Sequence, residues 1–487
     1  MNKKNIVVGL VILLALIGFI KKDLIFQAYF DQVSEQGYSR DDVLTIVINT
    51  PETDLSPYGK DLNNTLRTAN IYEGLVAFDS HLKVTPSLAL SWGNIDPVTW
   101  EFKLRKGVMF HDGTLFDATN VIQNFEEAKM EKGNPLSVYI NTIQTIESVD
   151  PFTIHIQTYA PDPLLLSKLT KLYIHRPDRV GTGSYKIREW IAGEKLSLTA
   201  FTDYWGRQPV FKNAEYKVVS NKTQRKIDFE NGKTDILVAV PREQALELPQ
   251  EQLKTSFSLE VNFLMFKTDE GVFAEKRIRE AIRTLFDPAK IEAIGNGFVR
   301  PATQFVAPGV YGYNPFIPAF SFDESLIEKA LFGNRLEKIV LDYLDSYSTL
   351  GDYLKKQLRE AGFSVKSNPI SPQELLDKIR KNQSSLFLIG WQAEDGDAGG
   401  FLDAFIHSQG EYNQGRYSNP EVDTLIEAGR QEMDAQKRLS LLQEIMLKID
   451  EDAIGVPLFE SSRLYAIKHD IAWEPRLDGL VLAADVR

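Results

Sequence analysis

Three carboxylates close together in the second half of the chain are the residues best suited to bind a ligand. They follow a tryptophan and alternate with glycines, in the order Trp391, Glu394, Asp395, Gly396, Asp397, Gly399 and Gly400. A partly buried carboxylate that meets an ammonium group forms a charge-assisted hydrogen bond, which is stronger than a neutral one. The tryptophan ring could wall such a pocket or cover a cation. The pattern therefore indicates a site for a positively charged group; a solvated acidic loop beside a core tryptophan is the alternative.

The same residues do not predict an enzyme. Paired carboxylates in glycosidases need separations of about 5–5.5 Å or about 6.5–9.5 Å, which neighbours on one loop do not guarantee. The chain has no cysteine, and no two of its six histidines are spaced to bind a metal from one helix. The nucleophile-elbow, zinc-protease and P-loop motifs are also absent. We therefore expect no catalytic residue, no metal site and no cofactor.

Composition and charge describe a soluble globular protein. The 487 residues are 43% hydrophobic and 25% charged. A chain of this length forms about two to four domains, or one large two-lobed body. The 55 lysine and arginine residues are outnumbered by 67 aspartate and glutamate residues, which gives a net charge of −12. Because an acidic surface repels phosphate, we expect no nucleic-acid partner.

The acidic residues follow the last strand of a predicted β-α-β-α-β unit. Strands are predicted over 337–344, 363–367 and 385–391, and helices over 348–361 and from a capping box at 371–374. This alternation predicts a mostly parallel sheet that is covered by helices. Ligands of such sheets bind beyond the carboxyl ends of the strands, which is where the acidic residues stand.

The front of the chain has a different pattern. Strands are predicted over 41–49, 97–105 and 152–158, and a hairpin over 184–201, with few helices between them. A strand-rich front half and an α/β back half favour two unlike lobes with the chain crossing between them.

The N-terminus has the layout of a secretory signal. Two lysines precede an unbroken apolar run at 6–20, which is short for a membrane span of about 20 residues. No convincing small-residue cleavage site follows, and the cysteine of a lipoprotein is missing. We expect export, with residues 1–23 as a cleaved signal or a retained anchor and residues 24–40 as a spacer.

Nine short segments between about residues 45 and 470 carry a family pattern. They are 55–57, 71–75, 86–92, 102–113, 181–186, 203–206, 277–282, 308–312 and 417–423. In this order and spacing, the chain resembles the family 5 extracellular solute-binding proteins, the oligopeptide- and dipeptide-binding receptors of ABC importers.

The resemblance implies an α/β, two-lobed periplasmic-binding-protein-like fold of the class II type. An extra subdomain would lie in the N-terminal half, and hinge strands would lie near 259–267 and 456–466. The implied division is lobe I from 41–70, 180–256 and 462–487, the inserted subdomain from 71–179, and lobe II from 257–461.

The resemblance also implies a function. A member captures peptides by lobe closure and delivers them to the permease subunits of an ABC transporter. Peptide-binding members hold the ligand's ammonium group with an aspartate three residues after the tryptophan, and Glu394 has that position here. Glutamate is one methylene longer, so Asp395 or Asp397 could substitute, with Trp391 completing the site.

Two alternatives to peptide import remain open. One is the same fold with another cargo, such as a metal chelate, an oligosaccharide or another cation. The other is a membrane-tethered sensor or scaffold that imports nothing. In each case we expect a non-enzymatic, extracytoplasmic monomer, which residues 6–20 would tether to the membrane if they are retained.

Overall fold

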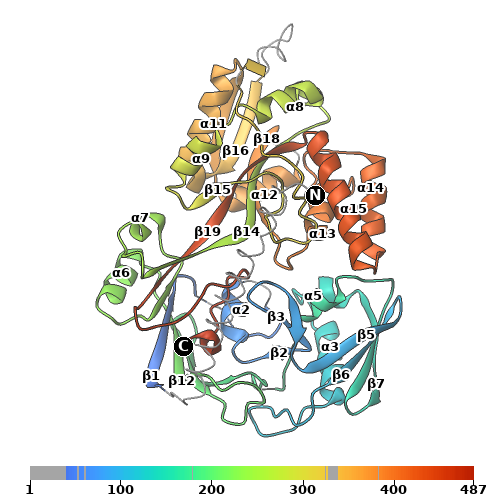
Figure 1. Cartoon of the computed structure of the whole chain (residues 1–487), viewed down its shortest axis with the longest axis vertical. Helices are drawn as coiled ribbons and strands as arrows, with labels where there is room; N and C mark the ends of the chain where they lie inside the picture. The colour runs from blue at the N-terminus through green and yellow to red at the C-terminus, as the bar shows by residue number, and fades with distance from the viewer. Residues whose placement is uncertain are drawn as a thin grey trace, which may run out of the picture.

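The computed structural model shows two bodies, one above the other in Figure 1, joined by long strands. The predicted signal or anchor segment and the spacer up to residue 39 lie outside the residues that the structure describes. The described residues are 40–51, 54–59, 62–177, 179–323, 325–326, 338–381 and 383–487. Within this part of the chain, no helix combines the length and the apolar character needed to span a bilayer.

One mixed sheet runs through both bodies. Among the described residues its eleven strands have the order β10-β11-β12-β1-β13-β19-β14-β18-β16-β17, and β15 adds to β19. In the lower body, β1 is parallel to β12 and β13, and β10 and β11 form the predicted hairpin. The elements here are β1 (Arg40–Ile48), α2 (Leu62–Thr68), β10 (Tyr185–Ile191), β11 (Lys195–Ala200), β12 (Phe211–Val218), α6 (Lys222–Glu230), β13 (Ile236–Val238) and α7 (Arg242–Ala245).

Two long antiparallel strands connect the bodies. They are β14 (Leu253–Phe266) and β19 (Gly455–Ile467). The lower end of β19 pairs with β13, the upper part of β14 pairs with β18, and β15 pairs with the middle of β19. The ladder between β14 and β19 is interrupted between Phe257 and Val261. The predicted hinge strands overlap these two elements. The chain therefore crosses between the bodies as strands of one sheet.

The upper body contains the predicted β-α-β-α-β unit. The strand β16 is parallel to both β17 and β18, and Ser371 caps α12 by accepting a hydrogen bond from the amide of Glu374. Two helices, α14 and α15, pack beside this unit (Figure 1). The elements are α8 (Lys276–Arg283), α9 (Pro288–Ile294), β15 (Val299–Pro301), β16 (Lys338–Leu344), α11 (Ser348–Glu360), β17 (Ser364–Ile370), α12 (Pro372–Arg380), β18 (Leu386–Gln392), α13 (Gly399–Phe401), α14 (Pro420–Gln431) and α15 (Ala435–Glu451).

A second, antiparallel sheet lies in the part of the lower body built from residues 73–174. Its strand order is β5-β6-β8-β7, and α3 packs on β7. This part has its own core around Phe102, Phe110 and Phe125. Its elements are β2 (Glu73–Gly74), β3 (Val76–Phe78), β4 (Val84–Pro86), β5 (Ala89–Asp96), β6 (Thr99–Leu104), α3 (Ala118–Met130), α4 (Ser137–Ile140), β7 (Ile143–Asp150), β8 (Thr153–Thr158), α5 (Leu165–Leu169) and β9 (Tyr173–Ile174). The predicted boundaries of lobe I, the subdomain and lobe II stay a prediction.

Candidate ligand-binding site

The predicted site begins at the end of β18. Trp391 pairs with Val261 of β14, and its ring lies edge-on to Phe405 with the ring centroids 5.3 Å apart. The indole Nε1 is buried and has no hydrogen-bond partner among the described residues. A buried indole N–H usually has a hydrogen-bond partner, so this enclosed donor is an exception.

Two of the three carboxylates lie close to a tyrosine of the lower body. Glu394 is exposed, and Asp395 is half-buried with its Oδ1 accepting a hydrogen bond from the amide of Asp397 at 3.2 Å. Burial first, and then the negative charges of Glu394 and Asp395, raise the pKa of Tyr139 to about 12. Tyr139 stands on α4 of the lower body, so the charges of these two carboxylates act on a residue of the other body. The sequence analysis missed Tyr139, because no local pattern marks it.

Asp397 has a different environment from the other two. Its carboxylate is buried and accepts hydrogen bonds from both Nη atoms of Arg438 on α15, at 2.5 and 2.8 Å. The amide of Gly399 donates to the same carboxylate at 2.7 Å. The carbonyl of Gly396 and the amide of Ala398 are hydrogen-bonded to the backbone of Tyr311. This geometry favours Asp397 as the anchor of the acidic loop, and its contact with a ligand stays a prediction.

The free energy of unfolding should fall as the pH rises from about 4 to 6, because the carboxyl group of Asp395 titrates at a higher pH in the folded protein. Burial first, and then the charge of Asp397, raise the pKa of Asp395 to about 6. The folded protein then keeps a proton that the unfolded chain has lost, so raising the pH favours unfolding. At about 1.4 kcal/mol per pKa unit, the stability of Asp395→Asn relative to wild type should improve by about 2 kcal/mol between pH 4 and pH 7.

Urea unfolding of both proteins at these two pH values measures this difference directly. The asparagine keeps an Oδ1 acceptor for the amide of Asp397, so the substitution removes mainly the charge. The free energies of unfolding of wild type and Asp395→Asn could instead differ by the same amount at both pH values. That result would show that the carboxyl group has the same pKa in the folded and unfolded chains.

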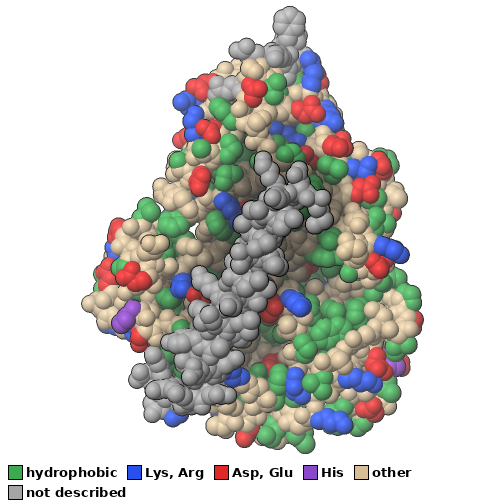
Figure 2. All heavy atoms as spheres, in the orientation of Figure 1, with side chains coloured by type: hydrophobic (Ala, Val, Ile, Leu, Met, Phe, Trp, Pro, Cys, Tyr) green, Lys and Arg blue, Asp and Glu red, His purple; other side chains and the backbone are tan. Residues whose placement is uncertain are grey.

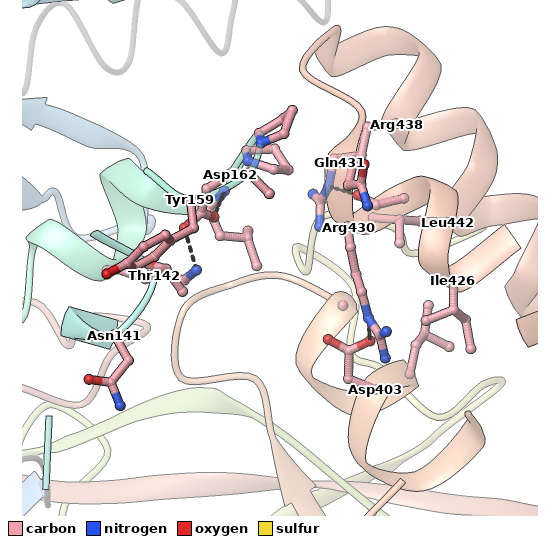
Figure 3. Close-up of a pocket in the computed structure, with 18 residues that line it drawn as sticks. Asn141, Thr142, Tyr159, Asp162, Asp403, Ile426, Arg430, Gln431, Arg438 and Leu442 are labelled. Atoms are coloured by element: carbon pink, nitrogen blue, oxygen red, sulfur yellow. Dashed lines mark hydrogen bonds and ion pairs between the residues drawn. The ribbon is translucent and has the colours of Figure 1, made fainter. Parts of the chain in front are cut away.

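A pocket of about 450 Å³ lies beside the acidic loop, between the two bodies. Figure 3 shows Asn141, Thr142 and Tyr159 of the lower body on one side of it, and Asp403, Arg430 and Arg438 of the upper body on the other. Several of its charges are paired within one body, as Lys168 with Asp162 at 2.5 Å and Arg430 with Asp403 at 2.8 Å. The space is therefore lined by residues of both bodies and not by ion pairs that bridge them.

Charge alone does not mark the site. Figure 2 shows acidic and basic side chains interspersed over the visible face, and the net charge of −12 is not gathered into one patch there. The acidic loop differs because its backbone is fixed and it lies at a boundary between bodies. Within the described residues, no group of three acidic or histidine side chains is arranged to hold a metal ion.

Two bodies joined by two crossing strands, with a pocket between them, are the arrangement expected of a two-lobed solute-binding protein. The comparison with protein families agrees with this class and with the predicted resemblance. The chain belongs to the bacterial extracellular solute-binding proteins, family 5, because the model of the family's middle region matches residues 83–413, more than half of the chain.

Several known proteins are similar to this chain. The glutathione-binding protein GsiB of Escherichia coli O6:K15:H31 is 26% identical over 475 residues, which cover 88% of this chain and 87% of GsiB. The structure of DppA from Helicobacter pylori in complex with the peptide STSA has a TM-score of 0.72 at 22% identity, covering 93% of this chain and 99% of DppA. NikA from Brucella suis, in complex with Fe(III)-EDTA, has a TM-score of 0.81 at 21% identity, covering 92% of this chain and 100% of NikA. The two structures confirm the predicted two-lobed fold.

Proposed function

We propose that this protein captures short peptides by their positively charged N-terminal end and delivers them to the permease of an ABC importer. The observation that carries the proposal is the pair of carboxylates at Glu394 and Asp395, which lies at the boundary of the two bodies. Tyr139 of the lower body lies near enough to both carboxylates for their charges to raise its pKa. The similarity to GsiB, which is named for glutathione, and to DppA with its bound peptide supports a peptide-like cargo.

The proposal includes a place of action. The protein would work as a monomer outside the cytoplasmic membrane, held there by residues 6–20 if these are retained. Membership of an extracellular family supports export. The apolar run at 6–20, with lysines on both sides, supports the tether.

Closure would supply the coupling between binding and delivery. A ligand shifts an open–closed equilibrium only by binding the closed form better than the open one. Moving that equilibrium from 1:99 to 99:1 takes about 5.5 kcal/mol of differential binding. A peptide bound between the bodies can contact both of them only in the closed form, and so its contacts contribute to this difference.

Glu394→Gln should weaken binding of the peptide STSA about 10- to 100-fold. The substitution keeps the shape of the side chain and removes the charge that a peptide ammonium would meet, and such charge-assisted hydrogen bonds contribute about 1.5–3 kcal/mol. Acetylation of the peptide's N-terminus should weaken binding to the wild type by a similar factor, with little further loss in the variant. Isothermal titration calorimetry measures the four affinities.

Glu411→Gln is a matched control, because Glu411 is another exposed glutamate of the upper body, with a side chain 68% exposed. It should leave the affinity unchanged. If wild type and Glu394→Gln bind free and acetylated STSA equally well, the ammonium role of Glu394 is wrong. A thermal-shift screen of glutathione, STSA, Fe(III)-EDTA and maltotriose then separates peptide from other cargo, because a bound solute raises the melting temperature by mass action.

A further inference from the structure

The turn between β3 and β4 holds one leucine in an unusual backbone conformation. Leu82 has a φ of +62°, a left-handed value that bulky side chains rarely adopt. The carboxylate of Asp79 accepts hydrogen bonds from the amides of His81 and Lys83, at 2.8 and 2.9 Å, and the amide of Asp79 donates to the carbonyl of Lys83. These hydrogen bonds hold the turn, and with it Leu82, in place. Strain that the surroundings maintain in this way is a reason to look for a function.

The same turn is fixed to the C-terminal segment of the chain. One Nη of Arg476 donates to the carbonyls of Phe78 and Asp79, at 2.9 and 3.2 Å, and the amide of Leu477 donates to the carbonyl of Ser80. Arg476 is itself buried and paired with Asp478 at 2.7 Å. The turn is therefore a rigid part of the lower body.

Leu82 reaches across to the upper body. Its side chain is half-buried against the hydrophobic core that contains Ala398 and Phe401. A Cβ atom built on Gly396 would lie 3.4 Å from the Cβ of Leu82, so the leucine rests directly on the backbone of the acidic loop. Similarly, the Cδ1 atom of Leu164 in the lower body would lie 4.0 Å from a Cβ atom built on Gly399. Two glycines of the acidic loop thus accept leucines from the other body.

We propose that Leu82 is a positioning residue that links lobe closure to ligand recognition. Its contact with Gly396 joins the two bodies, so we expect it to break when they separate, and Gly396 is the backbone position between Asp395 and Asp397. The contact would therefore add, in the closed form, a restraint on the acidic loop beyond the hydrogen bonds that hold it within the upper body. Glycine is suited to this place, because it has a φ of +70° and leaves room for the leucine. This inference rests on the proposed function of solute capture.

A cysteine pair tests the contact. The natural chain has no cysteine, so Leu82→Cys with Gly396→Cys can form only one intramolecular disulfide. The separation of 3.4 Å between the two Cβ positions is close to the range of about 3.5–4.5 Å for disulfides. In the full-length protein with copper–phenanthroline as oxidant, we expect this pair to cross-link at least about tenfold faster than Leu246→Cys with Gly396→Cys, as followed by mass spectrometry. Leu246 follows α7, which Figure 1 shows far from α13.

The peptide STSA should accelerate cross-linking of the Leu82–Gly396 pair further, by favouring the closed form. A second variant avoids a change at Gly396. Leu82→Gly removes the side chain but accepts the left-handed φ, and it should speed STSA dissociation about fivefold in stopped-flow measurements, with the urea midpoint kept. Leu246→Gly serves as its control.

Two results would overturn the inference. One is a Leu82–Gly396 pair that cross-links no faster than the control pair. The other is an STSA dissociation rate that Leu82→Gly leaves unchanged. If instead the wild type binds neither STSA nor glutathione, the proposed peptide cargo fails, while the comparison of the two cysteine pairs, which needs no ligand, still decides the contact.

Discussion

Arg438→Ala is expected to lower the free energy of unfolding by about 3–5 kcal/mol. The substitution leaves the buried carboxylate of Asp397 without its bidentate partner, and removing one partner of a buried ion pair typically costs this much. It also removes the hydrogen bond from Nε to the carbonyl of Gly429, which connects α15 to α14. Urea unfolding measures the loss. Arg438→Lys keeps the charge but not the planar pair of donors, so it should lose less than alanine and still be destabilised.

A neighbouring ion pair is a close control for this experiment. Arg430 and Asp403 form a similar contact at 2.8 Å, but both side chains are 43% exposed, against 5% and 6% for Arg438 and Asp397. Exposed pairs contribute about 0–1 kcal/mol, so Arg430→Ala should change stability by less than about 1 kcal/mol. Equal losses in Arg438→Ala and Arg430→Ala would mean that burial does not decide the strength of the anchor.

Glu73→Ala is expected to be about as damaging, with a loss of about 3–5 kcal/mol. The carboxylate of Glu73 accepts three hydrogen bonds, from Thr182 Oγ1 at 2.8 Å, the hydroxyl of Tyr204 at 2.8 Å and Trp205 Nε1 at 2.9 Å. Each donor left buried without a partner costs about 1–3 kcal/mol. Thr182→Val removes only one of the three donors and should lose correspondingly less. Urea unfolding at pH 8 compares the variants.

Glu73→Gln separates charge from hydrogen bonding at this position. Burial raises the pKa of Glu73 to about 7, against the hydrogen bonds of Trp205, Thr182 and Tyr204, which lower it. The wild type therefore loses stability as the pH rises from about 4.5 to 7, and glutamine does not. We therefore expect the free energy of unfolding of Glu73→Gln, relative to that of wild type, to be higher at pH 8 than at pH 5. Glu101→Ala, at a partly exposed glutamate of β6, should lose less than about 1 kcal/mol at either pH.

Local patterns in the sequence were sufficient for the β-α-β-α-β unit and for the position of the acidic loop. Hydrophobic periodicity and the Ser371 cap act over a few residues, so each element could be predicted from its own segment. The carboxyl end of the predicted strand at 385–391 is where the structure places the loop. The order of short segments likewise predicted the family, which the match over residues 83–413 confirms.

The partners of these residues could not be predicted in the same way. Arg438 lies 41 residues beyond Asp397, and Tyr204 lies 131 residues beyond Glu73, with no local pattern that connects them. Tyr204 and Trp205 stand in one of the short family segments, but that pattern does not identify the group to which their side chains donate.

The sequence by itself therefore determined the elements, the family and the loop that carries the carboxylates. Only the tertiary structure decided which carboxylate is already bonded and which is open, because Asp397 meets Arg438 while Glu394 is exposed toward solvent. It also decided that Leu82 faces Gly396. The physical reason is that secondary structure depends on interactions over a few residues, whereas burial and ion pairing depend on groups that folding brings together from distant parts of the chain.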